Sequence, residues 1–101
     1  MKKPQPDIFQ RYVEIKKLHP GTLLLFRNGD FYEAYFEDAE MISRYLGLTR
    51  TTYNKTGPNP VPMCGFPHYQ ISDYLNKLKQ LGYRVAAATE VDQKWISEIQ
   101  P

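Results

Sequence analysis

The sequence predicts an α/β fold of the α+β-like kind, a mixed β-sheet flanked by three helices in the order α-β-β-α-β-β-α-β. Apolar residues recur at helical spacing in three segments, and short apolar or aromatic runs bounded by turn residues separate them. The chain has 101 residues, of which 42% are hydrophobic. That length supports one core and not two domains.

The first predicted helix begins near Asp7, which suits a helix N-cap, and ends at Pro20-Gly21. Its apolar positions follow the helical period: Ile8, Tyr12, Ile15 and Leu18. Two strands follow, over residues 23–27 and 30–36, with Asn28-Gly29 between them. Asn-Gly between two apolar runs predicts a hairpin with a type I′ turn, because both residues tolerate positive φ.

The remaining elements follow the same rules. The second helix has Ala39, Ile42, Tyr45 and Leu46 on its buried side and ends at Gly47. The third has Ile71, Leu75, Leu78 and Leu81 and ends at Gly82. Further strands are predicted over residues 48–53, 61–64 and 83–89, with a loop over 54–60 and a turn over 65–67. We expect the domain to cover residues 1–90, and residues 91–101 do not have a strand pattern.

Composition excludes several classes of protein. No apolar run approaches the ~20 residues that a membrane span needs, and no signal peptide is evident. The single cysteine, Cys64, indicates a reduced, cytoplasmic protein. Two histidines and one cysteine argue against a zinc site. Neither glycine-rich nucleotide-binding pattern occurs, so we expect no cofactor and no metal.

Charge alone does not identify a partner. The net charge is +2, but five acidic residues and no basic one lie between Asp30 and Glu40, with basic segments on either side. The chain has eight tyrosines, and six of them lie in these basic segments. Aromatic and basic residues together suit nucleic-acid binding, and they suit an ordinary soluble surface equally well.

Two groups of residues have chemical interest. Asp7 followed by Glu14-Ile15-Lys16 is a weak match to a metal nuclease, but all four residues fall in one predicted helix. On the second hairpin strand, alternation places three side chains on one face: Phe31, Glu33 and Tyr35. Phe31 and Glu33 therefore lie side by side. By pattern alone, Phe31 is a core residue and Glu33 a solvent-facing one.

The hairpin region resembles a known family. The motif in this region is Phe26-Arg27-Asn28-Gly29-Asp30-Phe31-Tyr32-Glu33-Ala34-Tyr35-Phe36, followed by Asp38-Ala39. This motif is similar to the N-terminal mismatch-recognition domain of the MutS DNA mismatch-repair family. The resemblance continues through Pro62-Met63-Cys64-Gly65-Phe66-Pro67 and Gly82-Tyr83-Arg84-Val85-Ala86. It covers roughly residues 8–90. The family's ATPase and other domains have no counterpart in this chain. The chain is therefore either an excised domain or a free-standing relative, and we expect the second.

The resemblance implies roles for two residues. Phe31 would enter the minor groove as a wedge at a mispaired base, and Glu33 would form a hydrogen bond with that base. Arg50 and Lys55, in or beside the predicted loop, are our expected phosphate contacts. The implied protein is a non-catalytic DNA-binding module whose partners are double-stranded DNA, preferably mismatched, and other mismatch-repair proteins, with no membrane. The alternative is a protein-interaction module that modulates a full-length mismatch-repair protein and has lost DNA binding.

Overall fold

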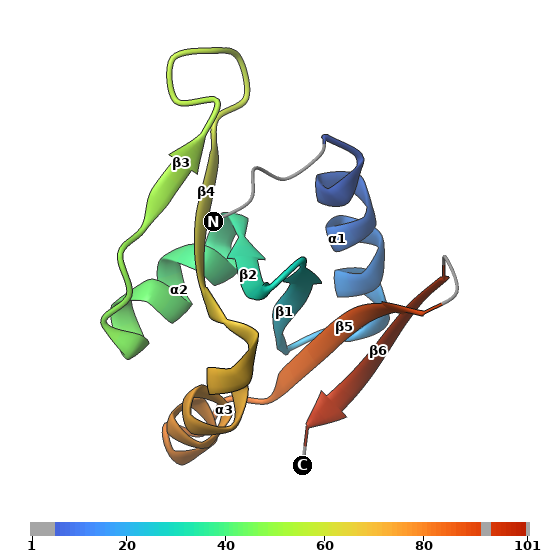
Figure 1. Cartoon of the computed structure of the whole chain (residues 1–101), viewed down its shortest axis with the longest axis vertical. Coiled ribbons are helices and arrows are strands. Elements are labelled where there is room, and N and C mark those ends of the chain that lie inside the picture. Colours follow the sequence, from blue (N-terminus) through green and yellow to red (C-terminus); the bar gives the residue numbers. More distant parts are fainter. Residues whose placement is uncertain (1–5, 92–93, 101) are drawn as a thin grey trace.

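The structure is a computed structural model that describes residues 6–91 and 94–100. Over these residues it contains three α-helices, one 3₁₀ turn and six strands (Figure 1). In chain order they are α1 (Pro6–Leu18), β1 (Leu23–Asn28), β2 (Phe31–Tyr35), α2 (Phe36–Leu46), β3 (Thr51–Tyr53), β4 (Val61–Pro67), η1 (His68–Gln70), α3 (Ile71–Gln80), β5 (Val85–Val91) and β6 (Lys94–Gln100). The predicted fold class and the order of helices and strands through β5 are confirmed.

The strands form one mixed sheet in the order β3-β4-β2-β1-β5-β6. β1 and β5 are parallel, and the other neighbouring strands are antiparallel. A mixed sheet results because α2 and α3 intervene between β1 and its parallel partner. Figure 1 shows β1 and β2 in the middle of the molecule, with the loop between β3 and β4 extending away from it.

The two faces of the sheet bury separate hydrophobic cores. One core lies under α2 and α3 and contains Leu23 and Leu25 of β1 together with Leu78 of α3. The other lies under α1 and contains Leu24 and Phe26 of β1 together with Tyr12 of α1. Successive residues of β1 thus point to opposite faces, which explains why its apolar run is uninterrupted. Within the described ranges, no helix is long and apolar enough to cross a membrane.

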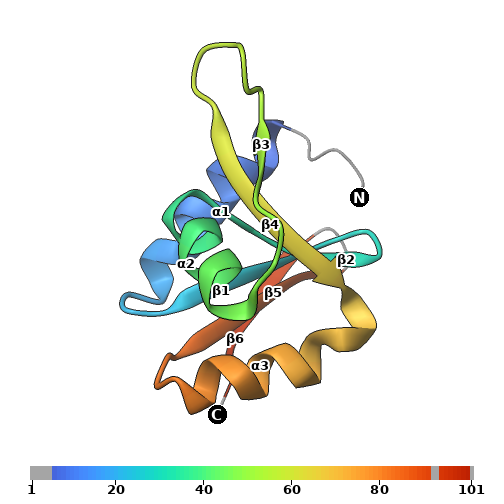
Figure 2. The same ribbon diagram turned by 90° about the vertical axis from the view of Figure 1, so that its left-hand side faces the viewer.

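The turn of the β1–β2 hairpin differs from the prediction. Asn28 pairs with Phe31, so the two loop residues are Gly29 and Asp30 and not Asn28 and Gly29. Gly29 has φ of +60°, whereas Asp30 is absent from the residues with positive φ. This pattern fits a type II′ turn, which needs glycine only at its first central position. The turn projects at one side of the molecule, away from α2 (Figure 2).

Several predicted boundaries are also corrected. β4 continues to Pro67, through residues predicted to turn the chain, and the turn follows in η1. Lys94–Gln100 form β6, although no strand was predicted there, because they pair along the whole of β5. The last apolar residues of two predicted helix stripes, Leu18 and Leu81, are 72% and 54% exposed. Both therefore lie beyond the part of the helix that packs on the sheet.

Candidate functional site

The hairpin turn positions the two residues singled out in the sequence. Phe31 is the first residue of β2, and Glu33 follows two positions later on the same face of the sheet. Residues two apart on a strand are about 7 Å apart, so these side chains are neighbours. The turn is held from the other side, because the His68 backbone N–H donates a hydrogen bond to the Asp30 carbonyl at 2.8 Å. Phe31 therefore has a fixed place at the hairpin end.

Glu33 is fully buried, with no exposed area. Its Oε1 atom accepts hydrogen bonds from Asn28 Nδ2 at 2.8 Å and from the Tyr35 hydroxyl at 2.7 Å. Its Oε2 atom is buried and has no hydrogen-bond partner among the described residues. Loss of hydration raises the pKa of Glu33 above its ordinary value, and the two hydrogen bonds oppose that change. The interpretation of Glu33 as solvent-facing is wrong.

Phe31 is half-buried. It pairs with Asn28 of β1 and Pro67 of β4, where the sheet reaches the turn. It belongs to neither of the two buried core clusters. The core interpretation of Phe31 is therefore incomplete, since part of this residue remains accessible beside an exposed turn.

The two predicted phosphate contacts lie away from Phe31. Arg50, just before β3, forms an exposed ion pair with Glu40 of α2 at 3.3 Å. Lys55 is exposed in the loop between β3 and β4. Phe31 pairs with Pro67 at one end of β4, and this loop adjoins Val61 at the other. Six residues of a strand span about 20 Å, so the structure does not bring Lys55 to the hairpin end.

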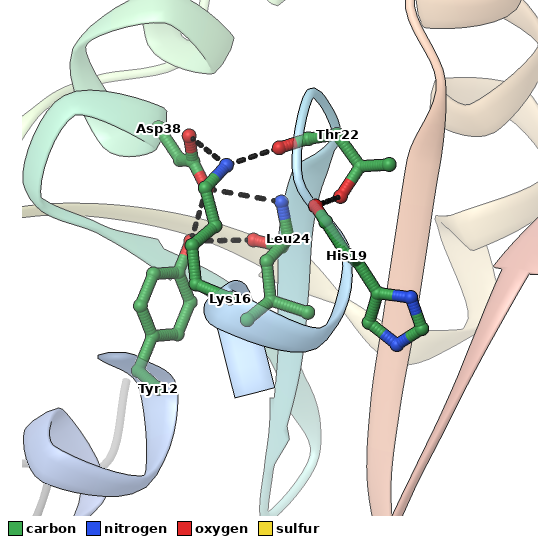
Figure 3. Close-up of polar contacts among 6 residues, drawn as sticks. All are labelled: Tyr12, Lys16, His19, Thr22, Leu24 and Asp38. Atoms are coloured by element: carbon green, nitrogen blue, oxygen red, sulfur yellow. Dashed lines mark hydrogen bonds and ion pairs between the residues drawn. The ribbon is translucent and has the colours of Figure 1, made fainter. Parts of the chain in front are cut away.

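A second polar cluster joins α1, β1 and α2 (Figure 3). Asp38 is buried in the first turn of α2 and accepts hydrogen bonds from the Tyr12 hydroxyl at 2.9 Å and the Leu24 backbone N–H at 3.0 Å. Lys16 Nζ forms an ion pair with Asp38 at 2.8 Å and donates a hydrogen bond to the Thr22 carbonyl. The weak nuclease match thus has a structural explanation, since Glu14 lies within α1 and Lys16 binds Asp38.

A cleft of about 630 Å³ lies beside this cluster. It runs between the C-terminal part of α1 and the first turn of α2, and its walls are mainly apolar. Lys16, Asp38 and Tyr83 are among the residues that line it. Phe31 and Glu33 are not among them, but Tyr35, whose hydroxyl donates to Glu33, also lines the cleft, so the cleft adjoins the hairpin site.

Sequence reasoning missed the two partners of Glu33. Tyr35 could have been found, because alternation places it next to Glu33 on the same face. Asn28 was assigned to the turn, and its contact with Glu33 follows only from the observed register. Neither residue type is unusual in a strand or at its end, so composition gave no signal.

The fold and the hairpin site define a small α/β domain, in which an aromatic ring and a carboxylate share one sheet face beside a turn. The family model described as MutS domain I matches residues 6–99, which is nearly the whole chain. The chain belongs to this family.

Its relatives carry the name DNA mismatch repair protein MutS. The protein from Desulfatibacillum aliphaticivorans is 48% identical over 82 residues, which are 81% of this chain and 9% of that protein. The protein from Lactococcus lactis subsp. cremoris (strain MG1363) is 47% identical over 83 residues, 82% of this chain and 10% of that protein. The protein from Desulforamulus reducens is 43% identical over 91 residues, 90% of this chain and 10% of that protein. The chain thus spans about a tenth of these relatives.

Proposed function

We propose that this chain binds double-stranded DNA without catalysing a reaction, and that it prefers mispaired or easily deformed duplex. Family membership and the names of the relatives support DNA mismatch repair as its setting. The observation that carries the proposal is that two residues lie side by side on β2: Phe31, which is half-buried, and Glu33, whose buried carboxylate lacks a hydrogen-bond partner at Oε2. The single, buried Cys64 supports a cytoplasmic location.

Phe31 is proposed to act as the wedge. A side chain inserted into the minor groove must unstack a base step, which costs a few kcal/mol and kinks the duplex. A mispaired base is already partly unstacked, so this deformation costs less at a mismatch. Phe31 suits the role because it lies beside an exposed turn and outside both core clusters. Discrimination then depends on the ease of deformation and not on base sequence.

Glu33 is proposed to contact the displaced base. A buried carboxylate oxygen without a partner destabilises a fold, and such residues are found where function requires them. Oε2 can accept a hydrogen bond from a base N–H, or it can donate one to a ring nitrogen when Glu33 is protonated. Because Glu33 has no exposed area, DNA binding must first uncover it. Movement of the adjacent Phe31 ring toward the groove is the change that would do so.

Arg50 and Lys55 are proposed as phosphate contacts. Arg50 would exchange its exposed partner Glu40 for a phosphate, at little cost because an exposed ion pair contributes about 0–1 kcal/mol. The distance of about 20 Å between the hairpin end and the β3–β4 loop corresponds to roughly six steps of 3.4 Å along one DNA strand. One duplex could therefore contact both ends of β4.

The test is fluorescence anisotropy with two labelled duplexes that differ by one mismatch, measured at several salt concentrations. We expect a higher affinity for the mismatched duplex, and loss of most of that preference in Phe31→Ala, because base–aromatic stacking contributes about 1–3 kcal/mol. Glu33→Ala should bind matched duplex as well as or better than the wild type, because a negative charge is removed, and should discriminate less. Glu37→Ala is the control, because it removes an exposed carboxylate near the same strand.

Equal affinity for the two duplexes, or unchanged discrimination in both hairpin variants, would overturn the proposal. Absence of any salt-dependent binding would favour the second candidate, a protein-interaction module that modulates a full-length mismatch-repair protein. The apolar cleft between α1 and α2 supports that candidate, because concave apolar surfaces are typical binding sites.

A further inference from the structure

The two hydrogen bonds to Glu33 both end on the same carboxylate oxygen. Asn28 Nδ2 and the Tyr35 hydroxyl lie 2.8 Å and 2.7 Å from Oε1. All three side chains are buried, and Oε2 has no partner among the described residues. A carboxylate that only needed stabilisation would gain more if the two donors were divided between its oxygens. The observed arrangement satisfies one oxygen and leaves the other open.

The geometry also determines where Glu33 can hold a proton. Each carboxylate oxygen has two lone-pair sites, and the two donors occupy both sites of Oε1. An added proton therefore binds Oε2, where it becomes a hydrogen-bond donor. Without that proton, Oε2 is an acceptor. In both protonation states the chemically active atom is Oε2, and its orientation is set by Asn28 and Tyr35.

We infer that Asn28 and Tyr35 are positioning residues, which hold the Glu33 carboxylate so that Oε2 is the one atom presented to a base. This inference rests on the proposed function, since it assigns how Glu33 would be prepared for contact. Asn28 belongs to β1 and flanks the turn, whereas Tyr35 belongs to β2 and lies in the core under α1. Two elements thus fix the carboxylate from different sides.

Within the part of the chain that the structure describes, no neighbouring ionisable group provides Glu33 with an opposite charge. Among the described residues, the titratable groups that interact with it are Tyr35 and Cys64 of β4. Burial raises the pKa of the Cys64 thiol to about 12 and raises that of Tyr35 further above its ordinary value. Both groups are therefore neutral near pH 7, and the hydrogen bonds from Asn28 and Tyr35 are the largest interactions that favour the charged form of Glu33.

The first experiment measures the pKa of Glu33 directly in the full chain, without DNA. The carboxyl carbon signals of a ¹³C-labelled protein are titrated by NMR, and Glu33→Gln identifies the Glu33 signal by its loss. Tyr35→Phe removes one hydroxyl and keeps the ring, and Asn28→Leu removes the amide at similar size. Each variant should raise the Glu33 pKa by about one unit, because each loses a hydrogen bond to the charged form.

Tyr12→Phe is the matched control. Tyr12 is another buried tyrosine of the same core, and its hydroxyl donates to Asp38 and to the Leu24 carbonyl, not to Glu33. It should leave the Glu33 pKa at the wild-type value. A purely structural role for Tyr35 would lower the stability of both tyrosine variants without a specific change in this pKa. An unchanged Glu33 pKa in Tyr35→Phe and Asn28→Leu would overturn the inference.

The second experiment connects the positioning to DNA. The ratio of affinities for mismatched and matched duplex is measured against pH, and its midpoint should move upward in Tyr35→Phe but not in Tyr12→Phe. If Glu33→Gln leaves the ratio unchanged, the proposed role of Glu33 fails. If Glu33→Gln lowers the ratio while Tyr35→Phe leaves both midpoint and pKa unchanged, only the positioning inference fails.

Discussion

Glu33→Gln should stabilise the free protein at neutral pH. The substitution keeps the side-chain length and retains an oxygen that can accept from Asn28 Nδ2 and the Tyr35 hydroxyl. It replaces the unpaired Oε2 by a neutral NH₂ group. The wild-type protein buries an ionisable carboxyl group in this place, whereas the variant buries a neutral amide there.

The size of the effect follows from the cost of burial. An unpaired buried polar group costs about 1–3 kcal/mol, and more when it is charged. The new amide also lacks partners for its hydrogens, which offsets part of the gain. We expect the free energy of unfolding at neutral pH to rise by about 1–2 kcal/mol. In a domain of this size, each kcal/mol raises Tm by about 4–8 °C.

The pH dependence has a definite sign. The pKa of Glu33 in the folded protein is raised above its ordinary value of 4.5, so the folded protein binds this proton more tightly than the unfolded chain does. Wild-type stability therefore falls as pH rises from about 4.5 through the folded pKa. Below that range Glu33 is neutral in both states. The advantage of Glu33→Gln should shrink as pH is lowered.

Urea denaturation followed by circular dichroism at a series of pH values measures this difference. Glu40→Gln is the control, because Glu40 is exposed and forms a surface ion pair with Arg50, so its loss should change stability by less than about 1 kcal/mol. The reasoning is refuted if Glu33→Gln is less stable than the wild type at neutral pH. It is equally refuted if the difference between the two proteins does not vary with pH.

Four further predictions concern other parts of the chain. Asp38→Ala should lower the free energy of unfolding by about 3–5 kcal/mol in a urea titration, because it removes the ion-pair partner of Lys16 and the acceptor of the buried Leu24 N–H. A loss below about 1 kcal/mol would contradict the role of this cluster. Gly29→Ala should lower Tm, because alanine at φ of +60° costs about 1–2 kcal/mol. DNA affinity should lie near the non-specific range, with a Kd of about 10⁻⁴–10⁻⁶ M and a log–log salt slope of about −2.7 for three phosphate contacts; tight binding insensitive to salt would exclude this picture. Binding should be unchanged by EDTA and by omission of nucleotide, and a loss of affinity on chelation would reveal a metal requirement.

Local patterns predicted the parts of the fold that depend on side-chain alternation. Period-two spacing assigned Phe31, Glu33 and Tyr35 to one face, and the structure has Glu33 bonded to Tyr35 there. That assignment did not depend on the turn. The predicted location of the turn was wrong because Gly29 can provide positive φ at either central position of a two-residue turn, and the local sequence does not choose between them.

The features that were missed depend on distant contacts. Glutamate is rarely buried without a charged partner, so no pattern rule would place Glu33 in the interior. Residues 94–100 lack clean alternation, and their strand forms because β5 provides a full edge to pair with. Asn28 was interpreted as a turn residue because the predicted turn lay one residue too early, whereas its amide is used inside the site.

The parallel pairing of β1 with β5 has a consequence for the order of events during synthesis. The apolar segment Leu23–Phe26 has its second sheet partner in residues 85–88, so one edge of the central strand has nothing to pair with until those residues are made. At 5–20 residues per second this interval is about 3–12 s. An unpaired apolar edge is a template for association with other chains. Ribosome-bound chains that stop before Val85 should therefore need protection by a chaperone, and the two cores should close together only after β5 emerges.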